Sequence, residues 1–235
     1  MRAFLLAAGL GTRLRPITDE LPKCLIPIHG KPLLIHWLDL LEKEDVSDVL
    51  VNTNHLADKV EEAVSRRRWN LRIKLSREPR LLGSAGTILK NLTFIEDEQN
   101  FFILYADNLT DVSLKPLRDL HSSVDSLFTT YVYETDIPRQ KGIFVVDEST
   151  GKVLDFEEKP INPKSNLANA GIGIASREIL KYLPDKIPSD LGFDVMPSIV
   201  SRMYAVKALG YIRDIGTKAD YEEAQHEWML RMRDR

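Results

Sequence analysis

The sequence predicts an α/β protein with a mixed, mostly parallel sheet flanked by helices. Two observations support this class. Strand-like and helix-like segments alternate along the first half, and the apolar run at 101–105 fits a central strand covered on both faces. A length of 235 residues suits one large domain better than two small ones, and no linker-like segment divides the chain. We therefore expect one Rossmann-like domain over 1–235, with an N-terminal half of about 1–110 and a second half of about 111–235.

The first half supplies alternating elements in chain order. Short apolar segments predict strands at 3–8, 49–51 and 71–75. Apolar residues at helical spacing predict helices from Pro32 to Leu41 and from Leu56 to Val64, and the proline fits a first helical turn. In a parallel sheet of this kind ligands bind at the carboxyl ends of the strands, so the loops that follow strands are the first candidates for a site.

The second half changes to strands that are joined by turns. Its strand-like segments are 127–133, 142–146 and 153–156. A last helix is expected to begin at Thr217 and to bury three side chains, Tyr221, Ala224 and Trp228.

Composition excludes several classes of partner. The formal net charge of −3 gives no reason to expect binding to nucleic acid or to an anionic membrane. No apolar run approaches the roughly 20 residues of a transmembrane helix. Cys24 is the only cysteine, so no internal disulfide can form, which favours a reducing cytoplasm. The sequence leaves the oligomeric state open.

The stretch LAAGLGTRLRPITDELPKCLIP places glycines and cations directly behind the first strand. Gly9 and Gly11 allow the backbone to approach a ligand closely, and consecutive N–H groups in such a loop bind anions. Arg13 and Lys23 follow, and they could complete a cradle for a triphosphate. Three explanations are weaker: a signal peptide with arginines in its cleavage region, a surface turn, and a dinucleotide-binding motif that has Leu14 in place of its third glycine.

Two acids lie at the ends of strand-like segments. Asp107 follows the run at 101–105, and Asp214 lies between apolar neighbours about a hundred residues later. Two carboxylates that converge beside a triphosphate could hold Mg²⁺, which prefers oxygen ligands. The competing explanations are a surface turn for Asp107 and a helix-capping or ion-paired acid for Asp214. No spacing of histidine and cysteine suggests zinc.

Two further groups of residues suggest a second substrate. Glu158 accepts hydrogen bonds of the kind that sugar hydroxyls donate, and Lys159 suits a phosphate, although a solvated charge run would also explain both. Asn169 adds an amide on the next strand-like segment. Glu78 and the glycine-containing loop at 83–87 could lie against a flat base, although a plain helix start explains that loop equally well.

Taken together and in this order, these segments resemble the sugar-1-phosphate nucleotidyltransferases, also called nucleotide-sugar pyrophosphorylases. The opening stretch is similar to the family signature G-x-G-T-R-L…P-K and is highly specific. The resemblance then covers nearly the whole chain. Each of five shorter blocks is weak evidence by itself, but their occurrence in the family's order is strong evidence: 82–86, 106–108, 158–160, 169–171 and 214–217.

The resemblance implies the nucleotide-diphospho-sugar transferase fold and an Mg²⁺-dependent enzyme that uses a nucleoside triphosphate and a sugar 1-phosphate. The products would be a nucleoside-diphosphate sugar and pyrophosphate. No covalent intermediate or general base is required, because the sugar-phosphate oxygen is already a nucleophile. The implied roles are catalysis by Arg13 and Lys23; nucleotide binding by Ala7, Ala8, Gly9, Gly11, Thr12, Arg13, Glu78, Gly83 and Gly86; sugar-phosphate binding by Gly142, Glu158, Lys159 and Asn169; and Mg²⁺ coordination by Asp107 and Asp214.

Base and sugar are less well determined. Glu78 followed by 82–86 most resembles the short guanylyltransferases that act on mannose 1-phosphate or heptose 1-phosphate, with uridylyltransferases for a hexose 1-phosphate close behind. Cys24 stands where many relatives have proline, and Lys141 replaces the usual aromatic residue before Gly142, which leaves the sugar open. Two further functions stay open: an enzyme like the choline-phosphate cytidylyltransferases, and a non-catalytic regulatory module that binds nucleotide sugars.

Overall fold

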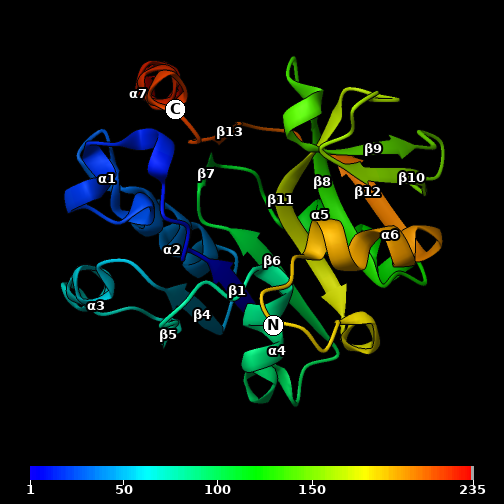
Figure 1. Ribbon diagram of the computed structural model, residues 1–235, viewed down its shortest axis with the longest axis horizontal. Helices are drawn as coiled ribbons and strands as arrows, with labels where there is room; N and C mark the ends of the chain where they lie inside the picture. Colours follow the sequence, from blue (N-terminus) through cyan, green and yellow to red (C-terminus); the bar gives the residue numbers. More distant parts are fainter. Residues whose placement is uncertain (234–235) are drawn as a thin grey trace. The chain divides into compact units, whose positions relative to one another are not determined.

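The computed structural model describes residues 1–233, and Figure 1 shows its helices and strands. The chain forms two compact units. Unit 1 consists of Met1–Phe4, Leu82–Leu104 and Ser113–Leu209, and unit 2 consists of Leu5–Leu81, Tyr105–Val112 and Gly210–Arg235. The chain passes between the units repeatedly, and strand β1 (Arg2–Leu6) contributes residues to both. The single domain over 1–235 with halves divided near residue 110 stays a prediction.

Unit 2 holds the first part of the alternating pattern. Strands β4 (Asp48–Thr53) and β5 (Arg72–Arg77) pair in parallel, as expected for strands joined by a helix. The remaining elements of this unit are η1 (Thr12–Leu14), α1 (Ile17–Glu20), η2 (Lys23–Leu25), β2 (Pro27–Ile28), β3 (Lys31–Pro32), α2 (Leu33–Lys43), α3 (Ala57–Ser65), β7 (Asn108–Thr110), β13 (Ile212–Asp214) and α7 (Lys218–Arg233).

Unit 1 contains the longer, mainly antiparallel part of the sheet. Strand β11 (Leu167–Ser176) runs antiparallel to β6 (Asn100–Tyr105), β8 (Phe128–Glu134) and β9 (Gly142–Val146). Strand β10 (Val153–Glu158) pairs with β9, and β12 (Met203–Lys207) runs parallel to β8. The helical segments are α4 (Ser84–Lys90), η3 (Leu92–Ile95), α5 (Lys115–Ser123), η4 (Pro138–Gln140), η5 (Arg177–Tyr182), η6 (Leu191–Val195), α6 (Met196–Ile199) and η7 (Val200–Arg202).

The α/β class, with a mixed and mostly parallel sheet flanked by helices, is confirmed. The helix predicted from Pro32 is α2, and its apolar residues at helical spacing are buried. The continuous apolar run at 101–105 forms most of β6, and Phe101, Phe102 and Leu104 are fully buried, as expected for a central strand. Among residues 1–233, no helix is long and apolar enough to cross a membrane.

The last helix closes the core of unit 2. Ala224 and Trp228 are four residues apart and therefore lie on one face of α7, where both are buried. They belong to an apolar cluster built from distant segments: Leu14, Ile26, Ile28, Leu33, Leu109 and Ile215. The predicted third residue, Tyr221, is only partly buried, and its hydroxyl donates to the Pro27 carbonyl over 3.0 Å.

We expect Trp228→Ala to lower the free energy of unfolding by about 3–5 kcal/mol, because it removes a large buried ring and leaves a cavity in this cluster. Urea denaturation would measure the change. Met232→Ala is the matched control, since Met232 lies on the same helix with 56% of its surface exposed, and it should change stability by about 0.5 kcal/mol or less. Equal effects of the two substitutions would contradict the packing described for α7.

Candidate functional site

The opening loop of unit 2 takes a shape that requires glycine at position 11. Gly11 has φ of +62°, in the left-handed region, and a Cβ added there would come within 2.8 Å of Thr18 Cγ2. The Thr18 hydroxyl donates to the Gly11 carbonyl over 2.8 Å, and the Leu14 N–H donates to the same carbonyl over 2.9 Å. Nothing lies within 4 Å of a Cβ added at Gly9, so the backbone there faces open space. The loop therefore has a fixed turn at Gly11 and an accessible backbone at Gly9.

A buried asparagine, Asn52, connects Ala7 with Glu78. In the sequence, these two residues were related only through the family resemblance. Asn52, at the end of β4, accepts a hydrogen bond from the Ala7 N–H over 2.7 Å and donates to Glu78 Oε1 over 3.0 Å. Glu78 is 1% exposed, so its carboxylate is part of the packed interior of unit 2. Sequence reasoning missed Asn52, although a polar residue at the end of an apolar strand was a usable signal.

Lys23 brings the two predicted acids together. Its ammonium lies 2.7 Å from Asp107 Oδ2 and 3.9 Å from Asp214 Oδ1. Short strands β7 and β13 explain the meeting: they pair antiparallel with Asp214 opposite Asn108, and the Ile215 N–H donates to the Asp107 carbonyl over 2.9 Å. Asp107 thus directly precedes the residue that stands opposite Asp214 in this two-stranded ladder.

Arg13 lies at the edge of the same group. A Cβ added at Gly216 would be 3.2 Å from an Arg13 guanidinium nitrogen and 3.5 Å from Asp214 Oδ1, which places the guanidinium and the carboxylate beside the same glycine. Arg13 is exposed, and the neighbouring Thr12 is also exposed. Unit 2 therefore gathers two cations and two acids from three distant parts of the chain.

In unit 1, Glu158 occupies a space that two glycines leave open. Gly142 stands opposite Glu158 in the ladder of β9 and β10, and a Cβ there would be 2.5 Å from Glu158 Oε2. A Cβ at Gly192 would be 2.6 Å from the same atom. Burial raises the pKa of Glu158, and the nearby charge of Asp190 raises it further.

Asp190 organises the segment that follows it, and sequence reasoning missed this residue. Its carboxylate accepts hydrogen bonds from the Gly192 N–H over 2.8 Å and the Ser84 hydroxyl over 2.8 Å. The loop predicted at 83–87 is fixed in the same region, because the Ala85 and Gly86 N–H groups donate to the Ser189 carbonyl over 3.1 and 3.2 Å. Gly83 has φ of +77°, and any Cβ there would overlap that carbonyl.

Lys159 and Asn169 are also in unit 1. Lys159 has φ of +51°, an unusual conformation for a residue other than glycine, and its N–H donates to the Lys141 carbonyl over 2.9 Å. Asn169 Oδ1 accepts hydrogen bonds from the Thr130 hydroxyl and the Gly171 N–H. Residues with strained backbone collect at functional sites, so the conformation of Lys159 is a useful signal that only the structure provides.

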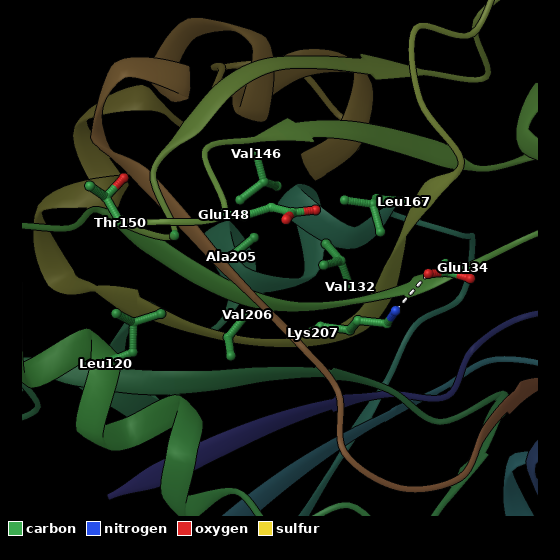
Figure 2. A pocket seen from close by; sticks show the side chains of 11 residues that line it. Leu120, Val132, Glu134, Val146, Glu148, Thr150, Leu167, Ala205, Val206 and Lys207 are labelled. Carbon is green, nitrogen blue, oxygen red and sulfur yellow. Dashed lines mark hydrogen bonds and ion pairs between the residues drawn. The ribbon is translucent and has the colours of Figure 1, made fainter.

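A cavity of about 500 Å³ lies elsewhere in unit 1. Figure 2 shows its apolar side chains, which come from β8, β9, β11, β12 and α5, with the ion pair between Lys207 and Glu134 (2.6 Å) at one side. None of the residues predicted for nucleotide, sugar phosphate or metal lines this cavity. We therefore assign no step of the chemistry to it.

Comparison with known proteins decides the family. A model described as "Nucleotidyl transferase" matches residues 2–229. The chain belongs to this family. The match spans both units and includes every residue of the candidate site.

Relatives with named activities are sugar-1-phosphate nucleotidyltransferases. The chain is 34% identical over 95% of its length to a UTP–glucose-1-phosphate uridylyltransferase of Synechocystis, and it covers 62% of that protein. It is 30% identical over 94% of its length to mannose-1-phosphate guanyltransferase beta-A of Xenopus laevis, again covering 62% of the relative. Among solved structures, HddC from Yersinia pseudotuberculosis complexed with GMP-PN matches with 26% identity and a TM-score of 0.79, covering 97% of this chain and 99% of that one. The chain thus spans less than two thirds of the length of the Synechocystis and Xenopus relatives.

We expect Gly11→Ala to destabilise the protein by about 1–2 kcal/mol, because alanine would have to adopt the left-handed conformation against Thr18. Gly9→Ala is the matched control: its Cβ enters open space, and stability should change by about 0.5 kcal/mol or less. Thermal unfolding of both variants would test this difference. A stable Gly11→Ala variant would mean that the turn is not fixed as described.

Proposed function

We propose that the protein transfers a nucleotidyl group from a nucleoside triphosphate to a sugar 1-phosphate, and releases a nucleoside-diphosphate sugar and pyrophosphate. The observation that carries the proposal is the meeting of Lys23 with Asp107 and Asp214 beside the loop that begins at Gly9. Family membership and the named activities of the relatives support the same reaction.

The nucleotide would be held by the opening loop of unit 2. Open backbone at Gly9 lets a phosphate approach the chain, and Gly11 and Thr12 begin the short helix η1. Arg13 and Lys23 would neutralise charge on the phosphates, and charge neutralisation is the largest contribution that a protein makes to phosphoryl-type transfer. Ala7, Ala8 and Glu78 complete the residues proposed for the nucleotide within unit 2, and the burial of Glu78 favours a contribution through its surrounding backbone. Gly83 and Gly86, also proposed for the nucleotide, belong to unit 1.

Mg²⁺ fits the donor set in unit 2. Asp107 and Asp214 both lie near the Lys23 ammonium, so two carboxylates that could bind a cation are held close together. Within residues 1–233 no group of three or more histidine, cysteine, aspartate and glutamate side chains surrounds a possible metal position, so water and phosphate oxygens would supply the other ligands, as Mg²⁺ prefers. When bound, the ion supplies neutralisation of the α-phosphate charge.

The sugar 1-phosphate would be held by unit 1. Glu158 would accept hydrogen bonds from sugar hydroxyls in the space that Gly142 leaves, and Lys159 would bind the phosphate. The Asn169 side-chain carbonyl oxygen accepts hydrogen bonds from within the protein. Its Nδ2 lies 4.0 Å from Met196 Sδ, which is a weak acceptor. The side-chain N–H groups are therefore suited to donate to a sugar hydroxyl.

The chemical step needs alignment and charge neutralisation more than proton transfer. An oxygen of the sugar 1-phosphate would attack the α-phosphorus, the bond from that phosphorus to the bridging oxygen of the β-phosphate would break, and pyrophosphate would leave with the electron pair. The attacking oxygen is already ionised, so no residue has to remove a proton. Holding the two phosphates in line then provides much of the rate enhancement.

GTP with mannose 1-phosphate or heptose 1-phosphate is our best assignment of the substrates. The guanylyl relatives and the complex of HddC with GMP-PN favour guanine, and the Synechocystis relative keeps UTP with a hexose 1-phosphate as the second candidate. The lone cysteine favours a cytoplasmic location; Cys24 is buried, and burial raises the pKa of its thiol to about 12, so it remains an unreactive thiol.

A screen of pyrophosphate release, with four nucleoside triphosphates against several sugar 1-phosphates and choline phosphate, tests the proposal. Turnover with at least one sugar 1-phosphate is the expected result. Turnover with choline phosphate alone would establish a cytidylyltransferase-like enzyme instead. Binding of a nucleoside-diphosphate sugar without turnover of any pair would establish a regulatory module.

We expect Asp107→Asn and Asp214→Asn each to abolish most activity, roughly 10²-fold or more, and to raise the Mg²⁺ concentration needed for the remainder. The double variant should lose little more than either single variant, because both acids would serve one ion. Asp58→Asn, at an exposed ion pair in the same unit, is the control and should keep normal turnover. Full activity of Asp214→Asn at an unchanged Mg²⁺ requirement would remove it from the metal site.

We expect Lys159→Gln to raise the KM for the sugar 1-phosphate by about tenfold or more while the KM for the triphosphate stays nearly constant, because the charge would meet only the sugar phosphate. Lys164→Gln is the control: Lys164 is an exposed lysine of unit 1 that pairs with Asp155 over 2.5 Å. Steady-state kinetics with each substrate varied would separate the two constants. A larger rise in the KM for the triphosphate would assign Lys159 to the nucleotide instead.

A further inference from the structure

Phe193 is a large aromatic side chain that unit 1 presents to solvent. It lies in the short π-helix η6, and 57% of its surface is exposed. The Lys159 ammonium lies over its ring, 5.6 Å from the centroid. A single exposed apolar residue is ordinary on a protein surface, so its meaning depends on how it is held and what surrounds it.

The backbone of Phe193 is fixed by a set of hydrogen bonds. Asp190 Oδ1 accepts from the Gly192 N–H over 2.8 Å and from the Phe193 N–H over 3.4 Å. The other oxygen of Asp190 accepts from the Ser84 hydroxyl over 2.8 Å, and the Asp190 N–H donates to Asp194 Oδ2 over 2.7 Å. An exposed ring on a backbone anchored in this way is suited to binding, because little freedom is lost when a ligand contacts it.

The same segment lies against the residues assigned to the sugar 1-phosphate. A Cβ added at Gly192 would be 2.6 Å from Glu158 Oε2, so a side chain at this position would displace the carboxylate. The glycine thus brings the backbone of η6 against the Glu158 carboxylate, and the next residue places its ring under Lys159. An acid, a cation and an apolar surface are therefore adjacent within one short region of unit 1.

We propose that Phe193 is a specificity-determining residue of the sugar 1-phosphate site, and that its ring packs against the C–H face of the sugar. A pyranose presents hydroxyls at its edge and C–H groups on its faces. Glu158 suits the hydroxyls, Lys159 suits the phosphate, and neither can hold the C–H groups, which an aromatic face can cover. This inference rests on the proposed function, since it names a further contact of the same substrate.

Steady-state kinetics of Phe193→Ala with the substrate pair identified by the screen tests the inference. Loss of the ring should raise the KM for the sugar 1-phosphate by about tenfold, the size expected for one lost apolar contact. The KM for the triphosphate and the kcat should each stay within about twofold, because the ring touches no reacting atom. Phe193→Tyr keeps the aromatic face and should restore the KM for the sugar 1-phosphate.

Ile161→Ala is the matched control. Ile161 is two residues after Lys159 and 81% exposed, and its replacement should change no constant beyond about twofold. An unchanged KM for the sugar 1-phosphate in a folded Phe193→Ala variant overturns the inference and leaves the proposed function intact, as does an equal rise in both KM values. Absence of turnover by the unmodified protein with every sugar 1-phosphate overturns both.

Discussion

The position of the Lys23 ammonium between two carboxylates is the interaction on which the rest of unit 2 depends. Two carboxylates held close together repel each other unless a cation lies near both of them. Lys23 offsets that repulsion at 2.7 and 3.9 Å, and its side chain is the most buried of the three, with 11% exposed against 39% for Asp107 and 27% for Asp214. The same trio links the opening loop to β7 and β13, so the backbone and the acids proposed to bind phosphate and metal are held in one frame.

In unit 1 the main electrostatic feature is the carboxylate of Glu158. Glu158 is partly buried, and the charges that act on it come from a second acid, Asp190, and from two lysines, Lys159 and Lys141, that oppose that acid. Burial is the largest cause of its raised pKa. The glycines at 142 and 192 make this arrangement possible, because a side chain at either position would displace the carboxylate. Unit 1 thus keeps a partly buried acid next to the lysine that we assign to the sugar phosphate.

The residues that we propose for phosphate binding differ from those that we propose for the choice of sugar. The relatives that the chain matches include both uridylyl and guanylyl enzymes, so their shared feature is transfer to a sugar 1-phosphate and not one base. In this chain the groups that would meet phosphates, Arg13 and Lys23, follow the opening strand directly. The groups that would select the sugar, Glu158 and Phe193, depend on the packing of β10 and η6.

The sequence by itself determined the alternation of strands and helices, the glycine-containing opening loop and the two acids at the ends of strands. These features are local: apolar spacing defines α2 and β6, and glycine defines the turn at Gly11. Only the tertiary structure decided that Asn52 joins Ala7 to Glu78, that Lys23 lies between Asp107 and Asp214, and that Asp190 anchors an exposed phenylalanine beside Lys159. Each of these arrangements joins residues far apart in the chain, and no local periodicity or turn preference encodes such a distance. Long-range packing alone brings these residues together.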